Sequence, residues 1–427
     1  MSIFVQIASY RDPQLVPTID DLIGKAKYPD LLTVAICRQY DPDDGFDNLD
    51  HYRNDHRFKI VDVDYTQSKG VCWARNCIQQ LYAGEDYTLQ IDSHSRFAHH
   101  WDEEIIAMIC GLQNKGYSKP VLTGYPASYD PANDQVLDTN SPPLQMVITH
   151  FLREGIPMCK SETIPGWQMF TAPVSARFYS AGFCFTLGSF CIDVQHDPEI
   201  YFIGEEISIA VRAFTHGYDL FHPHKMLLWH QYTRLDAAKH WDDDISWQEK
   251  NHMSFKKTRM LLGIDPGGET LTGKYALGSN RSLAEYEMYA GISFSRSGVQ
   301  NDTLSKAFPL PNYAKAKDKE WYARLLKYHE LEIVIDSKML SSINNILFTV
   351  LDSCNNAIHV KKIDNQDFIK NKNDNPQSII INTCFFTCYN PVTWVAQLIS
   401  ETNESIKTIK GRILFDEKNN NLPNCNL

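Results

Sequence analysis

The stretch YTLQIDSHSRF, residues 87–97, begins as a buried strand and ends in polar side chains. Leu89 and Ile91 are the apolar residues of a core strand, and Asp92 and His94 follow where that strand ends. Because side chains alternate in direction along an extended backbone, Asp92 and His94 are expected to point to one face. A carboxylate with a neutral imidazole suits a borderline divalent cation such as Mn²⁺ better than Ca²⁺, which prefers oxygen ligands. The end of this strand is therefore a candidate metal site.

A simpler interpretation also exists, because the pattern Asp-x-His is common by chance. His94 would then only cap the strand end, and Asp92 would start a turn. Three features elsewhere favour the metal site. Arg75 lies early in a helix that follows a glycine-led turn, which suits a phosphate group. His230 ends another apolar strand and offers a further nitrogen ligand, and a helix starts with Gly-Glu-Glu at residues 204–206.

Each of these features has an ordinary structural alternative. Arg75 is also consistent with a solvated charge on a helix surface. Glu205 and Glu206 would complement the dipole of their helix as first-turn acids. His230 stands beside an apolar run, where a buried histidine without a ligand role is common. The order of all the features together favours a functional site.

Strands and helices alternate along the first 125 residues. We expect strands at residues 3–9, 31–37, 58–65, 87–94 and 120–125, and helices at residues 12–27, 70–82 and 101–116. This order predicts an α/β fold with a mixed, mainly parallel sheet that helices cover on both faces. Such sheets bind ligands beyond the carboxyl ends of their strands, which is where Asp92 and His94 fall.

Changes in composition predict the division of the chain. Residues 1–313 are expected to form the catalytic domain, with a long loop region over residues 126–167 that folds over the site. Residues 314–330 are expected to form a Lys-rich linker helix, and residues 331–418 a small all-β accessory domain. The Asn-rich tail, residues 419–427, is expected to be disordered.

Composition excludes several classes of function. With 41 Lys and Arg against 52 Asp and Glu, the net charge of −11 argues against nucleic acid as a partner and against binding to anionic lipid. Eleven cysteines without framework-like spacing indicate reduced thiols. We see neither a leader pattern nor an apolar run long enough to span a membrane, and expect a soluble, cytoplasmic protein. Exposed β edges near the C-terminus permit a homodimer.

Six motifs in order carry a resemblance that covers residue 1 to about residue 294. They are IASYRDP, GVCWARN, LQIDSHSRF with WDEEI, SAGFCF, GEEI followed by GYD, and LGSNRSLAEYE. In this order they resemble the retaining, GT-A-fold polypeptide N-acetylglucosaminyltransferases of the cytoplasmic hydroxyproline type. The mucin-type polypeptide N-acetylgalactosaminyltransferases are similar at a greater distance. The resemblance implies a GT-A-like, Rossmann-like sheet for the N-terminal domain.

Site residues follow from the resemblance by position. It implies that Asp92 and His94 form a D-x-H metal motif and that His230 is the third ligand. It also implies a set of residues at the donor, with Glu205 and Asp92 as the catalytic pair. The donor set consists of Ala8 and Arg11 beside the uridine, Asp64 as a weaker uridine candidate, Arg75 at the diphosphate, Gly182 and Glu205 at the sugar, and Glu206. Glu206 departs from the mucin-type pattern, which has an amide there.

The resemblance implies a metal-dependent retaining glycosyltransferase. It would use Mn²⁺, or another divalent cation such as Mg²⁺, and transfer GlcNAc from UDP-GlcNAc to a hydroxyl group on a polypeptide. One alternative is the same fold acting on a glycan, such as a bacterial surface polysaccharide, with GlcNAc, GalNAc or glucose as the donor sugar. Another is a non-catalytic sugar-binding protein on a decayed transferase fold, although intact Asp92, His94 and His230 argue against decay.

Overall fold

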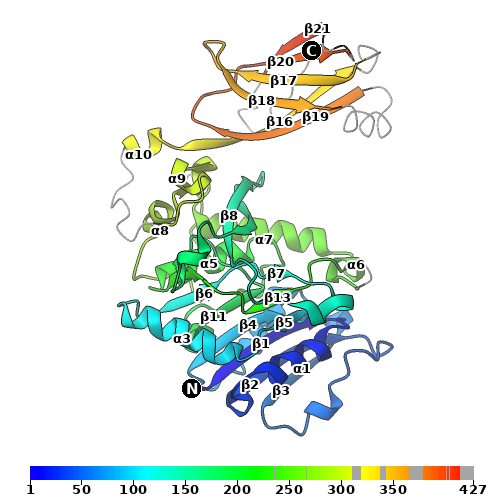
Figure 1. The fold of residues 1–427 in the computed structure, drawn as a ribbon, viewed down its shortest axis with the longest axis vertical. Helices are drawn as coiled ribbons and strands as arrows, with labels where there is room; N and C mark the ends of the chain where they lie inside the picture. The colour runs from blue at the N-terminus through cyan, green and yellow to red at the C-terminus, as the bar shows by residue number, and fades with distance from the viewer. Residues whose placement is uncertain are drawn as a thin grey trace. The chain divides into compact units, whose positions relative to one another are not determined.

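The computed structural model describes residues 1–234, 237–265, 267–309, 319–336, 343–364, 378–400, 402 and 404–413. The chain divides into two compact units. One unit consists of Met1–Ser295 with Asp302–Lys317, and the other of Arg296–Asn301 with Asp318–Leu427. Both units contain β-sheets among their described residues (Figure 1).

An eight-stranded mixed sheet forms the centre of the first unit, in the order β10-β12-β6-β11-β4-β1-β2-β3. Its strands are β1 (Ile3–Tyr10), β2 (Leu32–Tyr40), β3 (Phe58–Asp64), β4 (Tyr87–Asp92), β6 (Pro120–Thr123), β10 (Val174–Ser175), β11 (Phe183–Leu187) and β12 (Asp219–His222). Strands β4, β1, β2 and β3 run parallel, and β11 inserts antiparallel between β4 and β6. The α/β prediction, with a mixed and mainly parallel sheet, is confirmed.

Helices cover this sheet, and the alternation of side chains along β1 shows why both faces are buried. Ile3, Val5 and Ile7 point to one face, where they join a cluster that includes apolar residues of the helices α1 and α3. Phe4 points to the other face and packs in the cluster that contains Ile78 of α2. The helices of the first unit are α1 (Leu15–Lys25), α2 (Val71–Gln79), α3 (Trp101–Asn114), α4 (Phe190–Asp193), α5 (Glu205–Thr215), α6 (His240–Asp243), α7 (Trp247–Leu262), α8 (Leu283–Ala290) and α9 (Asn301–Leu304).

Two smaller β structures flank the main sheet. Strand β13 (Leu228–His230) pairs with β5 (Ser95–Phe97) and β7 (Ala127–Ser128). Strands β8 (Leu144–Phe151) and β9 (Pro157–Thr163) form a hairpin inside the segment that we expected to be a long loop. That expectation is wrong for the hairpin, because the run Met146, Val147, Ile148 is buried against the unit despite its polar flanks.

Several short elements lie in the first unit or at its end near residue 295. They are β14 (Ile292–Ser293) and the 3₁₀ helices η1 (Pro29–Leu31), η2 (Asp50–Tyr52), η3 (Tyr65–Gln67), η4 (Pro131–Val136), η5 (Trp167–Met169) and η6 (Phe294–Arg296). None of the helices in the described residues is long and apolar enough to cross a membrane.

The second unit is built from antiparallel strands. Its strands are β15 (Gly298–Val299), β16 (Leu326–Asp336), β17 (Asn345–Leu351), β18 (Ala357–Ile363), β19 (Ser378–Thr387), β20 (Thr393–Ile399) and β21 (Ser405–Arg412). Strand β16 pairs with β15 and β19, and a second sheet has the order β18-β17-β20-β21. One apolar cluster draws Leu331 and Ile333 from the first of these sheets and Phe348 and Trp394 from the second. The β-rich C-terminal region is therefore confirmed.

The linker helix expected over residues 314–330 is wrong in extent. Only α10 (Lys319–Ala323) is helical among the described residues there, and β16 already begins at Leu326. The reason lies in the side-chain period, because Leu331, Ile333 and Ile335 are buried while the residues between them are exposed. Residues 310–318 and the tail expected to be disordered lie outside the described residues.

The start of α5 depends on a glycine. Gly204 has φ +101°, and a Cβ atom there would lie 2.3 Å from the Thr258 hydroxyl oxygen. We expect Gly204→Ala to cost roughly 1–3 kcal/mol through backbone strain and this collision, and to lower the midpoint of thermal unfolding by several degrees. The matched control is Gly24→Ala in α1, where a Cβ atom meets nothing within 4 Å and alanine favours the helix. A Gly204→Ala protein that unfolds at the wild-type midpoint would contradict this account.

Candidate functional site

The ends of three strands bring the predicted metal ligands together. Asp92 is the last residue of β4, and it lies in register with Ala8 of the neighbouring parallel strand β1. The chain then turns into β5, where Ser95 pairs with His230 of β13. This pairing places His230 beside His94, with ring centroids 4.5 Å apart. The carboxyl edge of the sheet thus holds the group that the sequence predicted.

The geometry of this group fits a divalent cation. One ligand atom each from Asp92, His94 and His230 lie within 4.8 Å of one another, and Asp92 Oδ2 is 3.0 Å from His230 Nε2. One carboxylate and two imidazoles form a donor set that Mn²⁺ accepts. Burial opposes ionisation of Asp92, but His230 and Arg75 outweigh it and lower the pKa of its carboxyl group. Gly182 lies against the group, and a Cβ atom there would be 3.1 Å from Asp92 Oδ2.

Arg75 joins two carboxylates behind this group. Its guanidinium donates to Asp92 Oδ1 at 2.6 Å and also to Glu205, and only 3% of its surface is exposed. Burial would raise the pKa of Glu205, but Arg75 and His196 outweigh burial and lower it. The interpretation of Arg75 as a solvated helix charge is therefore wrong, because the side chain is buried and doubly paired.

A cavity of about 1020 Å³ opens over these residues. Its lining includes Ala8, Arg75, Gly182, Glu205 and Glu206, together with all three predicted metal ligands. A volume of this size is at the upper end for a small-molecule site, for which about 300–1,000 Å³ is usual. The cavity collects most of the site residues that the sequence predicted.

Two predicted donor residues lie elsewhere among the described residues. Arg11 does not line the cavity, because its guanidinium is held by the carboxylates of Asp41, Asp44 and Asp243. Asp64 caps the helix η3 and accepts from the Thr66 backbone at 3.0 Å and from its hydroxyl group at 2.6 Å. A role for either residue beside a uridine remains a prediction.

Comparison with known proteins identifies the family. The sequence profile described as "Glycosyltransferase (GlcNAc)" matches residues 2–58 and 45–296, which is more than half of the chain. The chain belongs to the GlcNAc glycosyltransferase family. It is accordingly an enzyme, a glycosyltransferase, and the match spans all residues that line the cavity, the predicted metal ligands included.

Solved structures resemble the chain at a greater distance. The structure of GalNAc-T7 with UDP, GalNAc and Mn²⁺ is 12% identical, with a TM-score of 0.45, over 70% of this chain and 59% of that chain. The chain thus matches little more than half the length of GalNAc-T7. Full-length S. aureus TarS is 11% identical, with a TM-score of 0.38, over 98% of this chain and 84% of that chain. Residues 1–349 of TarS in complex with UDP-GlcNAc are 13% identical, with a TM-score of 0.38, over 61% of this chain and 73% of that chain. No curated protein matches the chain.

The sequence did not indicate that Asp12 lies beside the predicted metal ligands, in contact with His94. Asp12 is 1% exposed, and its Oδ2 atom accepts from the Ser93 hydroxyl at 2.5 Å and lies 2.7 Å from His94 Nδ1. The guanidinium of Arg234 lies 3.1 Å from the same oxygen. These contacts orient the His94 ring with Nε2 directed away from Asp12. The one available signal was that Asp12 follows strand β1, the neighbour of β4.

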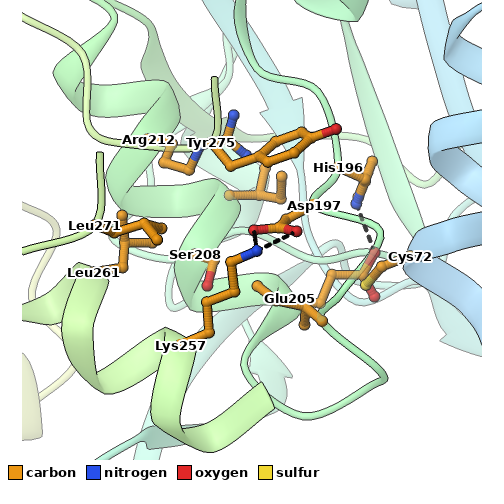
Figure 2. Close-up of a pocket in the computed structure, with 12 residues that line it drawn as sticks. Cys72, His196, Asp197, Glu205, Ser208, Arg212, Lys257, Leu261, Leu271 and Tyr275 are labelled. Atoms are coloured by element: carbon orange, nitrogen blue, oxygen red, sulfur yellow. Dashed lines mark hydrogen bonds and ion pairs between the residues drawn. The ribbon is translucent and has the colours of Figure 1, made fainter. Parts of the chain in front are cut away.

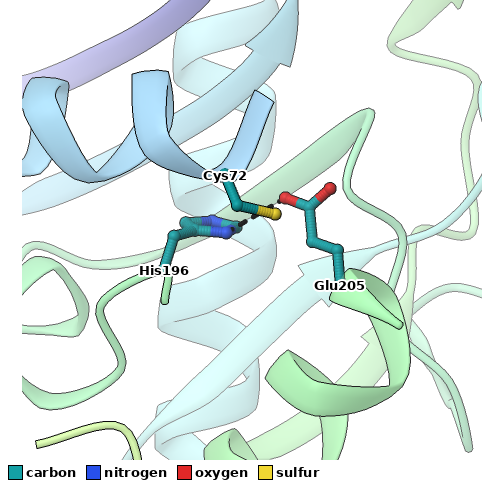
Figure 3. Close-up of side chains that lie close together, drawn as sticks. All are labelled: Cys72, His196 and Glu205. Atoms are coloured by element: carbon teal, nitrogen blue, oxygen red, sulfur yellow. Dashed lines mark ion pairs between the residues drawn. The ribbon is translucent and has the colours of Figure 1, made fainter. Parts of the chain in front are cut away.

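Glu205 has further buried partners that the sequence also did not indicate. His196 Nδ1 lies 3.0 Å from Glu205 Oε1, and the thiol of Cys72 lies beside the same carboxylate (Figure 3). Burial lowers the pKa of His196 and raises that of Cys72 well above its usual value. Glu205 therefore does more than complement the dipole of its helix, because its carboxylate is part of a buried network.

Glu206 differs from Glu205 in its protonation. Its carboxylate accepts from the Tyr125 hydroxyl at 2.5 Å and from the backbone of Ala181 at 3.0 Å. Burial raises the pKa of Glu206 from 4.5 to about 7, and these two hydrogen bonds only partly offset the effect. Glu206 therefore exchanges its proton near neutral pH while Glu205 stays ionised.

The raised pKa of Glu206 predicts a pH dependence of stability. Between pH 4.5 and 7 Glu206 keeps its proton in the folded transferase but loses it in the unfolded chain. The free energy of unfolding therefore decreases as the pH rises through this range, by roughly 3 kcal/mol in total. We expect Glu206→Gln, which mimics the protonated acid, to remove this loss. The variant should unfold at a higher temperature than wild type at pH 8 and near the wild-type temperature at pH 5.

The control for this measurement is Glu199→Gln, because the Glu199 side chain is 76% exposed. It should shift the unfolding midpoint equally at both pH values. If Glu206→Gln and wild type show the same pH profile, Glu206 does not titrate near neutral pH.

Proposed function

We propose that this transferase moves GlcNAc from UDP-GlcNAc to a hydroxyl group on a polypeptide, with retention of configuration and with the help of a divalent cation. The observation that carries the proposal is the group of Asp92, His94 and His230 beside Arg75 on the wall of one large cavity. Family membership supplies the sugar class. The sequence motifs quoted above support the polypeptide acceptor and the retaining outcome by resemblance.

The proposed cation ligands are Asp92 Oδ2, His94 Nε2 and His230 Nε2. Three protein ligands leave octahedral positions for two oxygens of a diphosphate, so Mn²⁺ or Mg²⁺ suits the site. When bound, such a cation neutralises charge that develops on the departing diphosphate. Asp12 keeps the Nδ1 atom of His94 occupied, which leaves Nε2 as the nitrogen available to the cation.

Arg75 contributes the fixed positive charge of the proposed mechanism. Its guanidinium is already aligned by Asp92 and Glu205, so it does not need to reorganise when negative charge builds up on the leaving group. The anionic Glu205 balances the positive charge that forms on the sugar ring as the bond to UDP breaks. The acceptor hydroxyl attacks from the face that UDP leaves and passes its proton to the departing phosphate oxygen.

Glycine at position 182 leaves space beside the reacting centre. A side chain there would occupy the approach to Asp92 and His230, since a Cβ atom would lie 3.1 Å from one and 3.8 Å from the other.

Removal of a proposed cation ligand tests this function. We expect Asp92→Asn to reduce kcat/KM for UDP-GlcNAc turnover by at least 10²-fold, since charge stabilisation in the transition state is the largest single contribution to the rate. UDP release is measured with a panel of UDP-sugars, with and without Mn²⁺. The matched control is His99→Ala, an exposed histidine near the same strand, which should keep wild-type turnover. Unchanged turnover in Asp92→Asn would refute the proposed site.

The acceptor class is decided in the same assay. Hydroxyl-bearing peptides and oligosaccharides are supplied with UDP-GlcNAc, and the stereochemistry of the product is read by NMR. Transfer to peptides with retention supports the proposal, whereas transfer only to oligosaccharides favours the glycan-directed alternative.

Asp12 allows the cation to be tested apart from turnover. We expect Asp12→Asn to weaken Mn²⁺ binding by about 10–100-fold, because loss of the carboxylate frees the ring orientation of His94. Binding is followed by electron paramagnetic resonance of free Mn²⁺ during titration of the protein. Asp43→Asn, at an exposed aspartate, serves as the control. Equal Mn²⁺ affinity in Asp12→Asn and wild type would remove Asp12 from the site.

A further inference from the structure

A second group of metal-ligating side chains lies behind Arg75, away from the proposed Mn²⁺ ligands. It consists of Cys72 on α2, His196 on the segment after α4, and Glu205 at the start of α5 (Figure 3). The sulfur, one nitrogen and one oxygen of these residues lie within 4.8 Å of one another. All three side chains are buried, with exposed fractions of 1%, 1% and 4%.

The hydrogen bonds of Gln90 determine the tautomer of His196. The Gln90 amide nitrogen donates to the Ala181 carbonyl at 2.8 Å, so its oxygen is the atom that faces His196 Nε2 at 2.7 Å. His196 must therefore carry a proton on Nε2. In the neutral ring, Nδ1 then presents a lone pair.

That lone pair meets another acceptor. His196 Nδ1 lies 3.0 Å from the carboxylate oxygen of Glu205, and within the described part of the chain it has no hydrogen-bond partner. With His196 neutral and Glu205 ionised, these two acceptors repel each other, and either a proton on Nδ1 or a metal cation between them removes the repulsion. The sulfur of Cys72 faces the same point, so the three atoms surround one small volume.

We propose that Cys72, His196 and Glu205 bind a sulfur-seeking divalent cation of the Zn²⁺ class. Thiolate, imidazole and carboxylate are all zinc ligands, and the thiolate selects against Mn²⁺ and Mg²⁺. Binding exchanges the thiol proton of Cys72, which passes to solvent, for a bond from sulfur to the metal. Zinc lies about 2.0–2.3 Å from such atoms, so small side-chain shifts close the site.

The surroundings leave room for one more ligand. A cavity of about 10 Å³ borders the three residues, which is the size of a single water molecule (Figure 2). Asp197 also borders this cavity, but Lys257 pairs with its carboxylate at 2.7 Å. Nearby, the positive charges of Arg75 and of the buried Arg212 balance the negative charges of Asp92 and Glu205, so the negative charge that the cation needs comes from the Cys72 thiolate.

A cation at this position would connect three segments that are distant in sequence. Helix α2 carries Arg75 as well as Cys72, and α5 begins with Glu205. The proposed site would therefore act as a structural clamp on the residues that hold Arg75.

Co²⁺ tests this site without any measurement of transfer, because a thiolate bound to Co²⁺ absorbs in the near ultraviolet and the Asp92 group contains no sulfur. The full chain is used, with the exposed Cys354, Cys384 and Cys388 and also Cys425 replaced by serine. We expect one equivalent of Co²⁺ to produce the absorption in this protein and in its Asp92→Asn variant. Cys72→Ser should abolish it, and the control Cys77→Ser, one helical turn and a half along α2, should keep it.

Two results would overturn the proposal. One is the absence of the thiolate absorption in the parent protein, and the other is its persistence in Cys72→Ser or in Cys72→Ala. A second measurement compares thermal unfolding with Zn²⁺ present and absent. Zn²⁺ should raise the unfolding midpoint of the parent protein by several degrees more than that of Cys72→Ser. Equal shifts in the two proteins would also reject the site.

Discussion

The ion pairs of Arg75 hold the site together. One guanidinium contacts Asp92 at the end of β4 and Glu205 at the start of α5. Arg75 and Glu205 are almost fully buried, and Asp92 is partly buried. Without the Arg75 guanidinium, the carboxylates of Asp92 and Glu205 would face each other with little water to screen them, and at least one would take up a proton. Arg75 thus sets the charge of the site as well as the distance between strand and helix.

The sequence predicted the part of the site that follows from strand ends. Asp92 ends β4 of the parallel core, whose strands present their carboxyl ends at one edge, and His94 follows it. His230 ends the apolar run of β13, which meets the chain after Asp92 through its antiparallel pairing with β5. Asp12 and His196 lie outside strands and helices, and their positions depend on how distant segments pack. No local pattern distinguishes them from ordinary polar loop residues.

Competition between partners explains why other donor residues were harder to predict. Arg11 stands one residue after β1, close to the expected nucleotide position, yet the acids Asp41, Asp44 and Asp243 hold it. Asp41 and Asp44 lie in the loop after β2, and Asp243 is the last residue of α6, far along the chain. A basic residue at a strand end is therefore unavailable to a ligand when the fold brings acidic side chains to it.

The fold, too, was predictable where the local sequence has a strong pattern and not where it lacks one. Alternating strands and helices in the first 125 residues were readable because each has a strong side-chain period. The hairpin of β8 and β9 was hidden by its polar surroundings, and β16 was partly mistaken for a helix because its first residues mix Lys and Tyr with Leu. In both segments the strand forms because one of its faces is buried by the rest of the fold, and the residue types alone do not reveal that burial.

The pairing of β13 with β5 has a consequence for biosynthesis. Asp92 and His230 are 138 positions apart in the chain, and they meet only when these short strands pair. A ribosome-bound chain that has exposed only β1 to β4 still lacks His230, one of the three proposed cation ligands. Such a chain cannot complete the proposed cation site until β13 has been made.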